Sequence, residues 1–295
     1  MFVTKEKDNK GKPEEQPLMN FKQKVAAFFK ELGIVLGLFL VINNFVIASF
    51  LVPTGSMENE VLTYEMLFVN KFIYGGSTPR NIPFTNVRLP FYQLPPLKDV
   101  QRGDVIVFVW PGNRDEILPE EFQFYLKRCV GMPGDTIRVT NRALYVNGTL
   151  SPLPRNVKYD NPMPLPAEYW EPNIFPRGSR WNGDFFGPLV VPQKGMTVDL
   201  TAENYLQWDT FIRREGHTVS QAGDLILIDG KPTKRYVVLR DYLFGMGDHR
   251  DNSLDSRYWG FIPKENLVGT PIVTYFSFTG EFPFVRFGRI GSIIK

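Results

Sequence analysis

Cysteine and histidine are nearly absent from this sequence of 295 residues, which contains one cysteine and two histidines. The single Cys129 excludes an intramolecular disulfide bond, so a domain outside the cell would have to be stabilised by its hydrophobic core alone. No zinc-ligand spacing is present. The net charge is only +3 and is spread along the chain. Since the sequence also lacks a basic helix and an aromatic–glycine signature, it gives no support for nucleic-acid binding.

Long uncharged stretches are also scarce, and the one in this chain runs for 21 residues from Leu32 to Val52. A helix needs about 20 apolar residues to cross a bilayer. We therefore predict a disordered, lysine-rich tail over residues 1–30 and a transmembrane anchor over residues 31–52. Lysines precede the run and the next basic residue after it is Lys71, which predicts an N-terminus in the cytoplasm. A cleaved signal peptide is the alternative, although its apolar core usually has only about 7 to 15 residues.

The sequence after the anchor is typical of β-structure. Short runs rich in β-branched and aromatic residues alternate with glycine and proline, as strands bounded by turns do. The clearest runs are residues 105–109, 136–139, 225–228, 236–239 and 271–276. Asn147-Gly148 and Asp229-Gly230 are hairpin signals. The predicted fold class is mainly β.

The middle of the chain has a different composition. Nine of the 24 prolines lie between Ser151 and Lys194, together with Trp170 and Trp181. This composition predicts an ordered but irregular segment. We therefore predict a β core formed by residues 53–140 and 241–295, split by an inserted β-rich, proline-rich subdomain over residues 141–240.

Two residues near these boundaries are candidates for chemistry. Ser56 follows the anchor closely and should lie at a membrane surface, although Pro53-Thr54-Gly55-Ser56 is also an ordinary turn and helix-start signal. Lys127 shares a face with Tyr125 and Cys129 if residues 122–130 form a strand. A buried lysine with no acid beside it has a lowered pKa and can act as a neutral general base. The alternative is a lysine on a solvated strand face.

The densest polar stretch runs from Gly247 to Arg257 and contains three aspartates and two arginines. Buried charges of this kind must pair with one another. A calcium loop would need a glycine at its sixth position and a terminal glutamate, and both are missing. His249 leaves open a Ser-His-Asp arrangement with Ser56, although the G-x-S-x-G elbow of α/β-hydrolases is absent. Cys129 is either a nucleophile or a core residue.

Taken together, these segments resemble type I signal peptidases, the membrane-anchored Ser-Lys endopeptidases that remove signal peptides from exported proteins. The resemblance covers the anchor and most of the chain after it, outside the insertion. Four segments carry it in the family's order: Pro53-Thr54-Gly55-Ser56-Met57, Arg102-Gly103-Asp104-Val105-Ile106-Val107-Phe108, Tyr125-Leu126-Lys127-Arg128 with Gly131, Pro133, Gly134 and Asp135, and Gly247 to Arg257 with Gly260 and Pro263.

The resemblance implies a role for each matching residue. Ser56 would be the nucleophile and Lys127 the general base, and the Ser56 N–H and the Thr54 hydroxyl would form the oxyanion hole. Ser253 would orient the lysine ammonium. The residues that would brace the site by ion pairing are Asp248, Arg250, Asp255 and Arg257. The residues that would line shallow pockets for small substrate side chains are Phe50, Pro53, Met57, Tyr125 and Leu126.

The resemblance also implies the protein's surroundings. Its partners would be the signal peptides of exported preproteins and the lipid bilayer, and it would act as a monomer without a metal or cofactor. It would be a single-pass protein of the cytoplasmic (inner) membrane, with the N-terminus inside and the β core acting as a catalytic domain on the outer or periplasmic face. The aromatic segment from Tyr275 to Ile290 would either rest on the membrane or pack into the core.

The sequence departs from the family's pattern beside the nucleophile. Glu58-Asn59-Glu60 replaces the usual proline and threonine, and His249 stands where asparagine is usual. The two glutamates would raise the pKa of Lys127 or alter substrate choice. A membrane-tethered low-activity or non-catalytic paralogue, acting as a binding or scaffold protein, is therefore the alternative function. A self-cleaving repressor-type Ser-Lys peptidase is the rival among enzymes, but it carries a DNA-binding domain where this chain has the anchor.

Overall fold

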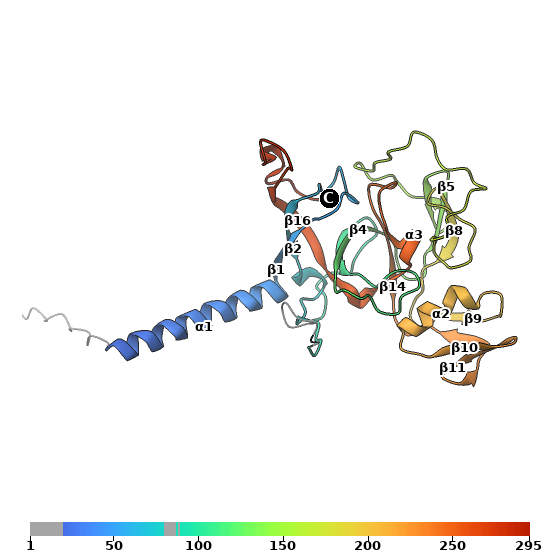
Figure 1. Cartoon of the computed structure of the whole chain (residues 1–295), viewed down its shortest axis with the longest axis horizontal. Coiled ribbons are helices and arrows are strands. Elements are labelled where there is room, and N and C mark those ends of the chain that lie inside the picture. The colour runs from blue at the N-terminus through green and yellow to red at the C-terminus, as the bar shows by residue number, and fades with distance from the viewer. Residues whose placement is uncertain (1–19, 80–86, 88) are drawn as a thin grey trace, which may run out of the picture. The chain divides into compact units, whose positions relative to one another are not determined.

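The computed structural model describes residues 20–79, 87 and 89–295, and Figure 1 shows the elements that they form. The described chain divides after Val41 into two units, which are treated separately below. Of the predicted tail over residues 1–30, residues 1–19 lie outside the described residues.

A single helix dominates the first unit. Helix α1 spans Phe21–Phe45, none of its residues is buried, and it is the one helix of the described residues that is long and apolar enough to cross a membrane. The uncharged run continues past its end, but Ile47–Leu51 forms strand β1 and pairs with β2 (Glu65–Asn70). The helix therefore ends at Phe45 and not at the predicted Val52, because a continuously apolar run carries no periodicity that marks a change from helix to strand.

The second unit is mainly β, which confirms the predicted fold class. Its largest sheet has seven strands in the order β1-β2-β16-β3-β4-β14-β15, with antiparallel neighbours. Its remaining strands are β3 (Val105–Val109), β4 (Phe124–Gly131), β14 (Tyr242–Met246), β15 (Ile262–Pro263) and β16 (Leu267–Ser277). Strand β16, from near the end of the chain, lies next to β2 (Figure 1). Its other neighbour in the sheet is β3.

Three smaller sheets are built mostly from residues of the predicted insertion. The four-stranded sheet β7-β6-β5-β8 contains β5 (Thr136–Thr140), β6 (Ala143–Val146), β7 (Thr149–Leu150) and β8 (Phe185–Val190). The other two contain β9 (Thr197–Asp199), β10 (Val219–Ala222), β11 (Leu225–Ile228), β12 (Lys231–Pro232) and β13 (Arg235–Val237). Because β5 pairs with β6 and β8, the predicted boundary after residue 140 falls inside a sheet.

The local signals of the sequence account for much of this strand pattern. Each of the five predicted runs overlaps a strand, and residues 105–109 and 225–228 coincide with β3 and β11. The Asn147-Gly148 hairpin joins β6 to β7, and Asp229-Gly230 joins β11 to β12. All four of these residues have positive φ, between +50° and +78°. Type I′ turns require this conformation at both central residues, which explains the choice of asparagine or aspartate followed by glycine.

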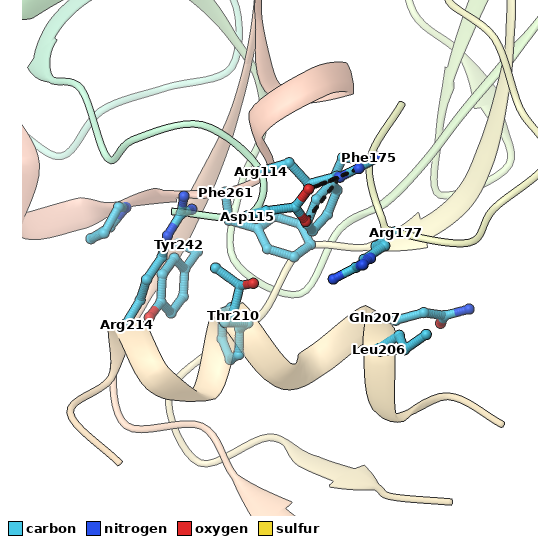
Figure 2. A pocket seen from close by; sticks show the side chains of 12 residues that line it. Arg114, Asp115, Phe175, Arg177, Leu206, Gln207, Thr210, Arg214, Tyr242 and Phe261 are labelled. Carbon is cyan, nitrogen blue, oxygen red and sulfur yellow. Dashed lines mark hydrogen bonds and ion pairs between the residues drawn. The ribbon is translucent and has the colours of Figure 1, made fainter. Parts of the chain in front are cut away.

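Helix α2 (Tyr205–Arg214) was not predicted from the sequence, and it attaches the insertion to the large sheet. The ring of Phe211 lies 4.9 Å from that of Tyr242 in β14. Arg214 lies beside Tyr242 at the C-terminal end of α2 (Figure 2) and donates to the carbonyl oxygens of Glu116 at 2.9 Å and Trp259 at 3.3 Å. Its guanidinium therefore ties α2 to a loop of the core and to the short helix α3 (Ser256–Trp259).

A buried carboxylate completes this attachment immediately after α2. The Glu215 side chain is fully buried and accepts hydrogen bonds from the hydroxyl groups of Tyr242 at 2.8 Å and Tyr236 at 2.5 Å. It also accepts one from the Leu239 backbone N–H at 3.0 Å. Three donors from residues 236–242 thus converge on one side chain.

We predict that Glu215→Ala lowers the free energy of unfolding by at least about 3 kcal/mol, because each buried donor left without an acceptor costs about 1–3 kcal/mol. Thermal and urea denaturation in detergent would measure the loss. Glu168→Ala, which removes an exposed glutamate of the same insertion, is the control and should change stability by less than about 0.5 kcal/mol. Equal losses in the two variants would contradict this assignment.

Candidate active site

Ser56 lies in the loop between β1 and β2, and the pairing of these strands fixes the loop at both ends. Val52 donates to the Glu65 carbonyl at 2.9 Å, and Tyr64 donates to the Val52 carbonyl at 2.7 Å. Met57 and Val61 are buried in a cluster with residues of β2 and β3. Because its neighbours on both sides are held by backbone bonds and packing, half-buried Ser56 has a fixed position.

Lys127 comes from β4, near the middle of the large sheet, and its Nζ lies 2.6 Å from the Ser56 Oγ. The lysine is only 3% exposed. Burial lowers the pKa of Lys127 from 10.5 to about 8, although the negative charge of Asp255 acts in the opposite direction. An amine with this pKa is partly uncharged near neutral pH, so it can accept a proton from the hydroxyl group that it contacts.

The neighbours of Lys127 follow the predicted alternation. Tyr125 and Cys129 pack in a cluster with Ile106 and Phe108, whereas Leu126 packs against the opposite cluster that holds Met57. Burial raises the pKa of the Cys129 thiol to about 12. Cys129 is therefore a core residue, and a nucleophilic thiolate at this position is excluded.

The polar stretch after β14 supports Lys127 through buried ion pairs. Asp255 accepts from the Arg257 side chain at 2.8 Å and from the Gly247 backbone N–H at 3.0 Å. Burial raises the pKa of Asp255, but the charge and hydrogen bonds of Arg257 lower it by more than burial raises it. The net pKa of Asp255 is therefore below its usual value. Asp248 accepts from Arg128 at 2.8 Å and 2.5 Å. A two-bond arginine–carboxylate contact of this kind also fixes the orientation of both groups.

The prediction that Arg250 braces the site through an ion pair is wrong. Its Nε and Nη2 are buried and have no hydrogen-bond partner among the described residues. Arg128 occupies the place beside Asp248 because strand alternation turns it to the opposite face of β4 from Lys127. No role in ion pairing was predicted for Arg128 from the sequence.

Ser253 lies next to the site, but the described residues give it no hydrogen bond to Lys127. Its Oγ is buried and has no hydrogen-bond partner in this part of the chain. The hydroxyl packs against Gly247, which also touches the Ser56 carbonyl oxygen. Ser253 is thus placed beside the loop that holds Ser56, and its hydroxyl has an unused donor and an unused acceptor.

The predicted oxyanion-hole groups face open space. Thr54 is exposed, and both Thr54 and Ser56 line one cleft. No hydrogen bond within residues 20–79, 87 and 89–295 uses the Thr54 hydroxyl or the Ser56 backbone N–H. Both donors are available to a group bound in the cleft.

That cleft has a volume of about 640 Å³, and both Ser56 and Lys127 line it. Its wall includes all five residues predicted to bind substrate: Phe50, Pro53, Met57, Tyr125 and Leu126. Sequence reasoning missed further wall residues, which are Leu51, Val52, Leu67, Val107, Gln123, Phe124, Asn252 and Leu254. Alternation along β3 and β4 would have pointed to Val107 and Phe124, whereas Asn252 and Leu254 reach the cleft only through the fold.

The two glutamates beside the nucleophile are bound by the insertion and do not contact Lys127. Glu58 accepts from Lys158 at 2.9 Å. Glu60 accepts from Asn156 and from the Lys295 backbone N–H, the latter at 2.7 Å. Neither glutamate is among the charges that shift the pKa of Lys127. The expected rise of that pKa through these two acids is therefore wrong.

The backbone of His249 binds the loop that holds Ser56. Its N–H donates to the Ser56 carbonyl at 3.1 Å. Its ring nitrogens lie 3.2 Å from the Gly55 carbonyl oxygen and 2.7 Å from the Asp160 carboxylate. Since both ring nitrogens have these partners and neither contacts the Ser56 hydroxyl, the alternative Ser-His-Asp arrangement does not form.

A family model for signal peptidase, peptidase S26, matches residues 25–276. This chain belongs to the signal peptidase family. Two proteins named signal peptidase I are similar to it over most of their length. The protein of Buchnera aphidicola subsp. Schizaphis graminum is 31% identical over 282 residues, which cover 90% of this chain and 82% of the relative. That of Pseudomonas aeruginosa is 30% identical over 286 residues, which cover 90% and 77%.

The comparison of structures gives a weaker likeness. A crystal structure of a signal peptidase I from Enterococcus faecalis is 20% identical in sequence, with a TM-score of 0.25, and the match covers 59% of this chain and 97% of the other. Membership of the family, established by the family model and the relatives, makes this chain a peptidase.

We predict that Gly247→Ala reduces the peptidase activity of this signal peptidase family member by about 100-fold. A methyl group at this position would overlap Ser253 and lie within 2.6 Å of the Ser56 carbonyl oxygen, so the nucleophile loop must shift, and small displacements in an active site cost about this much. Initial rates on a preprotein would measure the effect. Gly280→Ala is the control, because a methyl group there meets nothing within 4 Å. Wild-type activity in Gly247→Ala would refute the argument.

Proposed function

We propose that this protein is a membrane-anchored serine endopeptidase that removes signal peptides from exported preproteins, with Ser56 as nucleophile and Lys127 as general base. The observation that carries the proposal is the 2.6 Å separation of the Lys127 Nζ and the Ser56 Oγ at a buried lysine. The names of the relatives support the choice of substrate.

The first half of the reaction forms an acyl-enzyme. Uncharged Lys127 accepts the proton of the Ser56 hydroxyl as Oγ attacks the scissile carbonyl carbon. The carbonyl oxygen becomes an oxyanion, to which the Ser56 N–H and the Thr54 hydroxyl donate hydrogen bonds. The C–N bond then breaks, and the Lys127 ammonium gives its proton to the leaving amine.

The second half releases the signal peptide. Lys127, uncharged again, accepts a proton from a water molecule that attacks the ester, and the returned proton restores the Ser56 hydroxyl. We assign Ser253 as the group that accepts a hydrogen bond from the transient lysine ammonium, because its buried Oγ has no other partner among the described residues. Asp255, paired with Arg257, stabilises the same ammonium by its charge.

The cleft suits an extended peptide with small side chains. Phe50, Pro53, Met57, Tyr125 and Leu126 would form shallow pockets for the first and third residues before the cut. Strand β1, which contributes Phe50, lies at the edge of the large sheet. An edge strand offers backbone donors and acceptors with which an added strand can pair. We infer that substrate specificity depends mainly on the size of these pockets.

We propose a single-pass arrangement in the cytoplasmic membrane, with the N-terminus inside and residues 53–295 on the outer or periplasmic face. Support comes from the apolar helix α1 and from lysines such as Lys22 and Lys24 near its start. The rings of Phe282, Phe284 and Phe287 are more than half exposed. Because they do not pack in the core, we assign this segment to the membrane surface, where the protein would act as a monomer.

The alternative of a non-catalytic scaffold has no observation in its favour. It rested on Glu58 and Glu60, and these glutamates bond to Lys158 and Asn156 instead of Lys127. The change in sequence beside the nucleophile is thus matched by contacts with the insertion, and it leaves the Ser56–Lys127 pair in place.

Replacing either member of the pair should abolish cleavage. We predict that Ser56→Ala and Lys127→Met each lower the rate on a preprotein by at least about 10⁴-fold, since removal of a nucleophile or its base leaves only binding and oxyanion stabilisation. Mass spectrometry of the products would give the rate and the site of the cut. Ser220→Ala and Lys231→Met, at exposed residues of the insertion, are the matched controls. Cleavage by folded Ser56→Ala at the wild-type rate would rule out this nucleophile.

The pH dependence should report the ionisation of Lys127. Its pKa is lowered to about 8, and only the uncharged amine accepts a proton. We therefore predict that kcat/KM rises about tenfold per pH unit below pH 8 and levels off above it.

Lys71 provides a control for this titration, because burial also lowers its pKa to about 8 and it lies outside the site. Lys71→Met should keep the inflection near pH 8. A wild-type profile that is flat from pH 6 to pH 9, measured below the KM for the preprotein, would exclude a lysine base.

A further inference from the structure

A second cavity, here called the arginine pocket, lies away from the proposed catalytic pair. It has a volume of about 360 Å³. Three arginines line it, namely Arg102, Arg128 and Arg250, and no aspartate or glutamate does. The opposite wall comes from the β6–β7 hairpin and residues 151–154. Three guanidinium groups thus line one side of the pocket.

Two of the three arginines already have carboxylate partners. Arg102 donates to Asp135 at 2.7 Å, and Arg128 donates to Asp248. Arg250 is different, because it is only 3% exposed and its Nε and Nη2 have no hydrogen-bond partner among the described residues. Its positive charge is therefore buried with unused donors. Burial also lowers the pKa of Arg250, although the charges of Asp255 and Asp248 act in the opposite direction.

The backbone of Arg250 keeps this side chain in place. Its carbonyl oxygen accepts from Arg257 at 2.8 Å, and its N–H donates to the Lys158 carbonyl at 2.9 Å. The guanidinium consequently cannot leave the pocket by a shift of the main chain without breaking these bonds. A fixed guanidinium with free donors is the arrangement that recognises carboxylate and phosphate groups.

The rest of the wall indicates what accompanies the anion. Leu144, Val146 and Leu150 make the hairpin side of the pocket apolar, and Thr149 and Ser151 add two hydroxyl groups. A phosphate with carbon atoms attached would place its charge at the arginines and its apolar part against the hairpin.

We propose that the arginine pocket binds a phosphate group through Arg250, with Arg102 and Arg128 as neighbouring positive charges. Either free phosphate or the headgroup of a phospholipid supplies this chemistry. The arginine pocket is separate from the cleft that holds Ser56 and Lys127, because none of the three arginines lines that cleft.

The test uses the full chain in a zwitterionic detergent, in phosphate-free buffer at constant ionic strength. Inorganic phosphate and dihexanoyl phosphatidic acid are titrated separately, with thermal unfolding and calorimetry as readouts. A ligand that binds only the folded state raises the unfolding temperature as its concentration increases. We expect saturable binding of at least one of the two probes. Binding of the lipid alone identifies a headgroup site, whereas binding of both identifies a site for phosphate itself.

Arg250→Gln should weaken this binding at least about tenfold, since a hydrogen bond to a charged group is lost. Arg102→Gln is a second variant, at a side chain 43% exposed, and should weaken binding if Arg250→Gln does not fold. Arg235→Gln removes an equal charge from an exposed ion pair of the insertion and should bind as the wild type does. Absence of saturable binding of both probes to the wild type, or equal affinities in all folded variants, would overturn the proposal, and water would then be the partner of Arg250.

Discussion

The rest of the site is arranged around the contact between the Lys127 amine and the Ser56 hydroxyl. The proposed reaction requires that this amine be uncharged and shielded from water. Most lysines in proteins are solvated and protonated near neutral pH. Here the side chain is buried almost completely, and this burial outweighs the charge of Asp255, which acts to keep the proton on the amine. The nearby Arg257 limits that opposition by pairing with Asp255. Burial and the paired charges of Asp255 and Arg257 therefore both act on the pKa of the Lys127 amine.

The large sheet provides this environment by combining distant parts of the chain. Strand β16 lies between β2 and β3, and β14 lies beside β4. The loop that holds Ser56, the strand that holds Lys127 and the polar stretch after β14 consequently meet at one place. Gly247 sits where the loop and the polar stretch touch, and only a residue without a side chain fits there. Close packing at this point holds the loop that contains Ser56 in place.

The insertion is physically connected to this arrangement. Asn156 and Lys158 bind Glu60 and Glu58 in the nucleophile loop, and Asp160 binds the ring of His249. These partners lie at the positions where the sequence departs from the pattern of type I signal peptidases. The unusual residues of the loop and the residues of the insertion thus form one set of contacts. On this basis the insertion helps to position the nucleophile loop, in addition to whatever its exposed surface binds.

The sequence by itself determined the mainly β fold class, the hairpins at Asn147-Gly148 and Asp229-Gly230, and an apolar N-terminal helix, because each depends on local propensity or composition. Motif order also determined the family. Only the tertiary structure decided that the helix ends at Phe45, that Arg128 instead of Arg250 pairs with Asp248, and that α2 closes the insertion against the core. These features depend on which distant groups approach one another. A buried charge takes whichever partner the fold brings within reach, and no local pattern records that choice.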